Sequence, residues 1–185
     1  MNIKQALSRL KPASAMAVLT HPDPRLSQKC DEVQLDCETE MAEISQLVED
    51  LIVTMRKENG AGLAAIQVGI PKRVFVYDNS DVESDQTSAT AIINPVITFA
   101  SEELTEDDEG CLSFPALYAP VTRSQKVVVS GYNQAGEPVT AEAEDFLARV
   151  FQHEIDHLDG ITFVMHLPDE AKMQALREYF DLHAG

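Results

Sequence analysis

Two histidines and a glutamate in residues 153–157 form the pattern H-E-x-x-H. On an α-helix, residues i and i+4 lie on one face, so the imidazoles of His153 and His157 can reach one metal ion. Glu154 lies one step farther round the helix and can reach a water molecule on that ion, where a carboxylate can act as a general base. The pattern therefore predicts a metal site that performs hydrolysis.

A catalytic site of this kind needs a third protein ligand and leaves one position open for water. The longer pattern H-E-x-x-H-x-x-G-x-x-H is matched at Gly160, but Phe163 stands at its last ligand position and His166 comes three residues too late. Glu178 could supply a carboxylate from a later helix, and Cys111 could supply a thiolate. The residues alone leave both candidates open.

The H-E-x-x-H pattern lies in a predicted helix over residues 142–158. At about 100° per residue, Val150, His153 and His157 fall within about 40° of Phe146, so we expect both histidines on the buried, apolar half of this helix. The other half is polar and carries Asp145, Arg149, Gln152 and Asp156.

The remaining elements must position this helix. Apolar residues spaced by three and four predict a second helix over residues 37–57, and a third is expected over residues 169–182. Four segments have patterns typical of strands: 73–77, 91–99, 126–132 and 137–141. Pro95 marks an edge or a bulge in the second of them.

Two polar segments are expected at the surface: residues 79–90 as a loop, and residues 101–109, with six acids, as a mostly solvated rim. The mixed order of hairpins and helices favours an α+β fold. We expect mostly antiparallel strands and hairpins around the central helix that carries the H-E-x-x-H pattern.

Composition limits the possible functions. The 185 residues fit one domain, which we assign to residues 16–185, with residues 1–15 as an N-terminal extension. The net charge of −17 disfavours binding to nucleic acid, and no apolar run approaches the ~20 residues of a membrane helix. The three cysteines indicate a reducing cytoplasm; the basic, acid-free extension gives only a weak signal for organellar import.

Three segments together resemble one known family. They are residues 60–67 (GAGLAAIQ), 109–113 (EGCLS) and 152–157 (QHEIDH), and they match the motifs of the peptide deformylases in the same order along the chain. The resemblance also includes residues 22–26 and extends through about residue 167.

The resemblance implies that Cys111, His153 and His157 bind one divalent metal ion, with Fe²⁺ expected and Zn²⁺, Ni²⁺ or Co²⁺ able to substitute. It implies hydrolysis of the formyl group on the N-terminal formyl-methionine of new polypeptides by a metal-bound hydroxide, with Glu154 as general base. Gln67 and the backbone N–H of Leu112 would hold the developing oxyanion.

The same resemblance suggests which residues bind substrate: Ala61, Gly62, Gly110, Tyr118, Phe146 and Val150. Gly60 and Gly62 would let the backbone approach the substrate closely and adopt positive φ. Some family members use an Arg a few residues after the Cys, whereas residues 114–120 contain none, so Tyr118 is the candidate substitute. Arg123 could instead pair with Glu109 and hold the segment that carries the Cys.

For partners, we expect formyl-methionyl nascent peptides, no nucleic acid, no membrane, and a monomeric enzyme. Residues 168–185 carry a net charge of −2 rather than a basic helix, so ribosome contact is expected to be transient at most. The alternatives are a different H-E-x-x-H metallopeptidase that uses Glu178, and a non-catalytic or specialised relative that keeps the fold.

Overall fold

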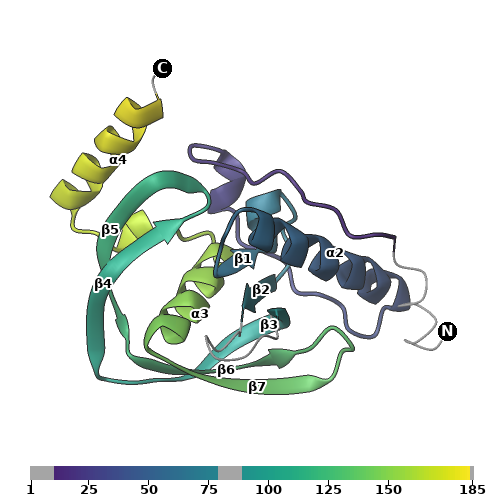
Figure 1. The fold of residues 1–185 in the computed structure, drawn as a ribbon. Coiled ribbons are helices and arrows are strands. Elements are labelled where there is room, and N and C mark those ends of the chain that lie inside the picture. Colours follow the sequence, from purple (N-terminus) through teal and green to yellow (C-terminus); the bar gives the residue numbers. More distant parts are fainter. Residues whose placement is uncertain (1–10, 79–88, 184–185) are drawn as a thin grey trace.

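The computed structural model describes residues 11–78 and 89–183 (Figure 1). One antiparallel sheet has five strands in the order β1-β2-β3-β6-β7. These strands are Gly62–Ala64, Val74–Asp78, Ala89–Ala100, Lys126–Tyr132 and Pro138–Glu144. A separate antiparallel hairpin pairs β4 (Leu104–Cys111) with β5 (Phe114–Ser124).

Three α-helices complete the described fold: α2 (Glu38–Lys57), α3 (Asp145–Leu158) and α4 (Asp169–His183). Short 3-10 turns lie at Pro24–Ser27, Ala65–Val68 and Phe163–His166. Helix α3 runs through the centre of the molecule, with the β4–β5 hairpin on one side and the five-stranded sheet on the other (Figure 1). The α+β prediction with a central H-E-x-x-H helix is confirmed.

The two faces of the sheet are covered by different helices, because side chains alternate along a strand. In β2, Phe75 and Tyr77 pack against α3, where the rings of Tyr77 and Phe151 meet edge to face with centroids 4.7 Å apart. Val74 and Val76 pack on the opposite face, against α2. Both faces of β2 are therefore buried, which explains its continuous apolar run.

The predicted elements recur with shifted ends. Residues 79–88 of the predicted loop lie outside the described residues, and its last two residues already belong to β3. The bulge predicted at Pro95 is confirmed, because the register of β3 against β6 shifts between Ile93 and Val96.

The predicted start of the central helix at residue 142 is wrong. Residues 142–144 still pair with β6, with Glu144 opposite Lys126, so β7 continues to residue 144. Asp145 then adopts a positive φ of 51°, which turns the chain into α3.

The prediction of a solvated rim at 101–109 is only partly right. The acidic side chains of Glu106, Asp107 and Asp108 are exposed, but their backbone forms most of β4 and pairs with β5. An exposed hairpin strand needs no apolar pattern, because its backbone hydrogen bonds hold it in place. Glu109, the last acid of the run, is buried at 4% exposure.

Residues 11–14 of the predicted N-terminal extension pack against α2. Residues 1–10 of the predicted extension lie outside the described residues, while the backbone N–H groups of Lys11 and Ser14 donate to side chains of α2, to Gln46 Oε1 at 2.7 Å and Asp50 Oδ1 at 2.9 Å. None of the helices in residues 11–78 and 89–183 combines the length and the apolar character that crossing a membrane requires.

Candidate metal centre and active site

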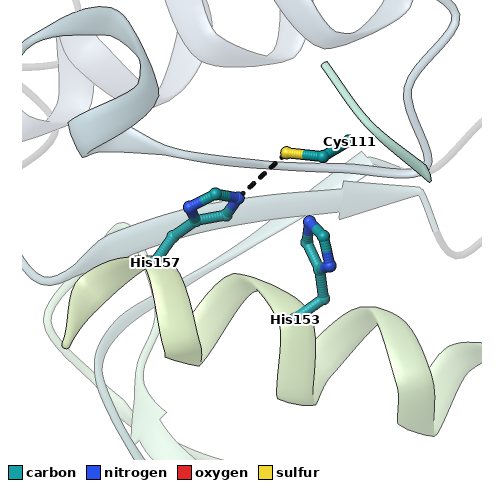
Figure 2. Close-up of side chains that lie close together, drawn as sticks. All are labelled: Cys111, His153 and His157. Atoms are coloured by element: carbon teal, nitrogen blue, oxygen red, sulfur yellow. Dashed lines mark hydrogen bonds between the residues drawn. The ribbon is translucent and has the colours of Figure 1, made fainter. Parts of the chain in front are cut away.

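Cys111, His153 and His157 lie together, although Cys111 and His153 are 42 positions apart in the sequence. Both imidazoles project from one face of α3 toward the sulfur at the end of β4 (Figure 2). Cys111 Sγ is 3.2 Å from His157 Nε2, and one ligand atom from each residue lies within 4.8 Å of the other two. One ion could reach all three atoms, and a thiolate with two imidazoles is a donor set that divalent transition metals accept.

The orientation of His153 is fixed by Glu109. His153 Nδ1 lies 3.0 Å from Glu109 Oε2. Burial acts to raise the pKa of Glu109, but hydrogen bonds from His153 and Arg123 outweigh it and hold that pKa well below its ordinary value. An ionised carboxylate only accepts hydrogen bonds, so Nδ1 carries a proton, and Nε2 is the nitrogen that would give up its proton to bind a metal ion.

Glu109 itself is held by two guanidinium groups. Arg123 donates through Nε to Oε1 at 2.8 Å and through a terminal nitrogen to Oε2 at 3.1 Å. Arg149 donates to Oε1 at 2.9 Å and to the Val121 carbonyl at 2.7 Å, which ties the network to β5. The predicted pairing of Arg123 with Glu109 is therefore present, and it is buried on both sides.

His157 is fully buried, and its Nδ1 has no hydrogen-bond partner among the described residues. Burial lowers the pKa of His157 well below its ordinary value, with help from the positive charges of His153 and Arg123. This histidine is therefore neutral, which is the form that binds a metal ion.

Glu154 lies beside the three donors with its carboxylate buried. Its Oε2 has no partner among the described residues, although unpaired buried carboxylate oxygens are costly. Burial raises the pKa of Glu154 to about 7, despite the opposing effect of His153. A carboxyl group with such a pKa can both accept and donate a proton near neutral pH.

Gln67, in the 3-10 turn after β1, contacts the same sulfur. The backbone N–H of Ala64 donates to Gln67 Oε1 at 2.8 Å, so the amide nitrogen must face the other way. That nitrogen donates to Ser113 Oγ at 3.2 Å and toward Cys111 Sγ at 3.6 Å. The amide is thus oriented as an N–H donor at the metal-ligating group.

A pocket of about 610 Å³ opens above these groups. Its floor includes Gln67, His153 and Glu154. Leu112 lines it as well. So do all the residues that the resemblance suggested for substrate binding: Ala61, Gly62, Gly110, Tyr118, Phe146 and Val150. Phe146, expected on the buried half of the helix, is 67% exposed because it lies at the pocket rather than in the core.

The positive φ expected at Gly60 and Gly62 is wrong, and the structure shows another reason for glycine at both positions. Neither Gly60 nor Gly62 has a positive φ. A Cβ on Gly62 would lie 2.6 Å from Glu154 Oε1, and one on Gly60 would lie 2.8 Å from Leu112 Cδ1. A side chain at either position would therefore displace a neighbouring side chain of the site.

Two residues considered as ligands lie elsewhere. Glu178 is exposed on α4, and its Oε1 accepts a hydrogen bond from Gln174 Nε2 at 2.9 Å. His166 lies 2.7 Å from Asp156 Oδ2, which also accepts from Arg123 at 2.6 Å. Neither belongs to the metal-ligating group of the described residues.

The sequence did not reveal that the polar side of helix α3 contacts the β4–β5 hairpin. Arg149 was placed on the polar side of the helix, yet it is only 6% exposed, because the β4–β5 hairpin covers that side. Gln152, on the same side, exchanges hydrogen bonds with the backbone of Ser124 at 2.9 and 3.1 Å. The only available signal was the polar face itself, which looks the same whether it meets water or backbone.

Comparison with known proteins points to one family. The family model for polypeptide deformylase matches residues 15–173. A peptide deformylase of Acidothermus cellulolyticus is 45% identical over 135 residues, which cover 73% of this chain and 71% of that protein. One from Rhizobium meliloti is 39% identical over 158 residues, covering 85% and 88%.

Solved structures agree as well. The crystal structure of the peptide deformylase of Ehrlichia chaffeensis matches with a TM-score of 0.82 and 33% identity, over 92% of this chain and 98% of that one. The Thermus thermophilus enzyme matches with a TM-score of 0.79 and 38% identity, over 89% and 95%. The chain therefore belongs to the polypeptide deformylase family, metal-dependent hydrolases that remove the formyl group from N-terminal formyl-methionine.

Proposed function

We propose that this chain hydrolyses the formyl group of formyl-methionyl polypeptides with Glu154 as the proton-transfer residue and with a metal ion held by Cys111, His153 and His157. One observation carries the assignment: a buried carboxylate with an unpaired oxygen lies beside three metal donors at the floor of an open pocket. The products are formate and a free amino terminus.

The metal we propose is Fe²⁺, with Zn²⁺, Ni²⁺ or Co²⁺ able to replace it. One sulfur and two imidazole nitrogens suit several of these ions, so the choice of iron rests on the family rather than on the donors. A divalent ion in such a site lowers the pKa of bound water to about 7 and polarises a carbonyl group.

Glu154 would accept the proton of the attacking water and then deliver it to the nitrogen of the departing amine. Its pKa of about 7 supports both steps, because the group is then partly ionised at neutral pH. Gly62 supports the geometry, since its missing side chain leaves room for the carboxylate.

The formyl oxygen becomes negative as the water attacks. We assign its stabilisation to Gln67 Nε2 and to the backbone N–H of Leu112. The fixed amide orientation of Gln67 supports this role, because preorganised donors need no rearrangement during the reaction. Loss of one such donor typically costs about 3 kcal/mol of activation free energy.

The methionine side chain would lie against Val150, Phe146 and Leu112, which line the pocket with apolar surface. The backbones of Ala61, Gly62 and Gly110 would run along the substrate, and Tyr118 would meet the residues that follow the methionine. We further propose a monomeric, cytoplasmic enzyme with at most transient ribosome contact, because residues 168–185 carry a net negative charge.

The test is formate release from formyl-Met-Ala-Ser, using protein prepared without oxygen, with metal content measured on the same sample. We expect release that follows bound metal and stops in Glu154→Gln, which should still bind the ion. Cys111→Ala should lose both metal and activity, whereas Glu178→Gln should keep both. Activity that survives Cys111→Ala but not Glu178→Gln would favour a different metallopeptidase, and a metal-loaded wild-type protein without formate release would indicate a non-catalytic relative.

A further inference from the structure

We propose that the pocket selects the residue after the formyl-methionine, favouring Lys or Arg and disfavouring Asp or Glu. This inference rests on the proposed function and names the class of nascent chain that the enzyme processes fastest. It is carried by the charge and the aromatic groups at the open end of the pocket.

The pocket has a chemical end and an open end. Gln67, His153 and Glu154 at the floor are at most 8% exposed, and Glu154 Oε2 there is buried without a hydrogen-bond partner among the described residues. Tyr118 and Phe146, which line the same pocket, are 70% and 67% exposed. When the formyl group of a substrate lies at the floor, the rest of its chain must therefore extend out of the pocket past these exposed residues.

The volume supports contact with more than one residue. A pocket of about 610 Å³ lies within the range of about 300–1,000 Å³ that encloses ligands of drug size. Formyl-methionine fills only part of it, so the next residue of the substrate lies at the open end.

Two exposed carboxylates line the pocket, and no exposed Lys or Arg among the described residues lines it with them. Glu58, just after α2, and Asp108, on β4, both line the pocket and are exposed. Among the described residues that line it, Arg149 alone is a Lys or Arg, and its guanidinium is buried and engaged by Glu109. Lys57 reaches Glu58 at 3.6 Å, but it is 64% exposed and outside the pocket lining, so its pairing is weak.

The aromatic rings make the same end suitable for a long cationic side chain. An ammonium or guanidinium group is attracted to the face of an aromatic ring, and its aliphatic stem packs on apolar surface. Tyr118 lies over Gly110, where any side chain would meet its ring. Tyr118, Phe146, Glu58 and Asp108 thus combine ring faces with negative charge, a combination that favours Lys or Arg and repels carboxylates.

The experiment compares kcat/KM of the metal-loaded enzyme for three peptides: formyl-Met-Lys-Ser, formyl-Met-Gln-Ser and formyl-Met-Glu-Ser. Exposed charge pairs each change binding a few-fold, so two carboxylates that attract Lys and repel Glu should give about a tenfold ratio between the Lys and Glu peptides at low salt. The ratio should shrink at high salt, because exposed charges are screened.

A double variant, Glu58→Gln with Asp108→Asn, should bring the ratio close to one. The matched control is Glu43→Gln with Glu170→Gln, which removes two exposed carboxylates outside the pocket lining and should keep the ratio. Equal kcat/KM for all three peptides would overturn the inference and leave the proposed function standing. The same holds if the control lowers the ratio as much as the pocket variant, whereas formate from none of the peptides would refute the proposed function itself.

Discussion

Replacing Gly62 by alanine would disturb the position of Glu154 while leaving the metal donors in place. The added Cβ would lie 2.6 Å from Glu154 Oε1 and 2.9 Å from its Cδ and Cγ. Ordinary contact begins at 3.4 Å, so the carboxylate must shift by about 0.8 Å. The backbone of Gly62 pairs with Tyr77 and has no positive φ, so the substitution adds no backbone strain.

A displacement of about 1 Å in a catalytic geometry typically costs about a hundredfold in rate, equivalent to about 2.7 kcal/mol. We therefore expect kcat for formate release to fall about a hundredfold in Gly62→Ala, with bound metal and the melting temperature nearly unchanged. Gly110→Ala is the comparison, because its Cβ would meet the ring of Tyr118, which is exposed and free to turn. That change should raise KM more than it lowers kcat.

Two results would refute this reasoning. A fully metal-loaded Gly62→Ala enzyme with wild-type kcat would show that the position of Glu154 does not limit the reaction. The double variant with Glu154→Gln should lose little beyond Glu154→Gln alone, because both changes remove the same function. Fully additive losses would mean that Gly62 acts through something other than Glu154.

Three further predictions concern the network, the metal and a buried thiol. Glu109→Gln should lower metal affinity about 10- to 100-fold, because His153 loses the hydrogen bond that orients it. It should also lower the free energy of unfolding by about 3–5 kcal/mol, because Arg123 and Arg149 are left buried without their carboxylate. Metal titration and denaturant unfolding would measure the two effects, and unchanged values would contradict the network. A chelator should abolish formate release and lower the melting temperature. Metal ions returned at about 1,000 times Kd should raise the free energy of unfolding by about 4 kcal/mol. A melting temperature that does not change with metal would argue against the site. Burial raises the pKa of Cys30 to about 11, so its thiolate is scarce below that pH. Iodoacetamide at pH 8–9 should therefore label exposed Cys37 and leave Cys30 unmodified until the protein unfolds. Peptide mass mapping would show which cysteine is labelled.

The metal ligands divide into those that local sequence determines and one that it does not. His153 and His157 follow from helix geometry, because four residues on an α-helix return to the same face. Cys111 comes from the end of a strand, and residue chemistry alone could not choose between it and Glu178. Its assignment at the sequence level needed the resemblance, since a contact between distant segments leaves no periodic signal.

The fold was predicted best where one face of an element is apolar. Helix α2 differs from its predicted range by one residue at its start, because its buried positions recur every three or four residues. Strand β4 was missed because its side chains are acidic and solvated, and only its backbone pairing with β5 makes it a strand. A hydrophobic pattern cannot reveal an element that buries almost no apolar surface.

The same limit explains why the support of the site was harder to predict than its chemistry. Glu109 is the last of the six acids in residues 101–109, and composition alone would place it in water with the others. It is buried because β4 ends against α3, where Arg123, Arg149 and His153 surround its carboxylate. Asp108, one residue earlier, points to the opposite side of the strand and remains exposed at the pocket. Strand alternation thus gives two adjacent acids different tasks, one orienting a metal ligand and the other, by our inference, selecting substrate.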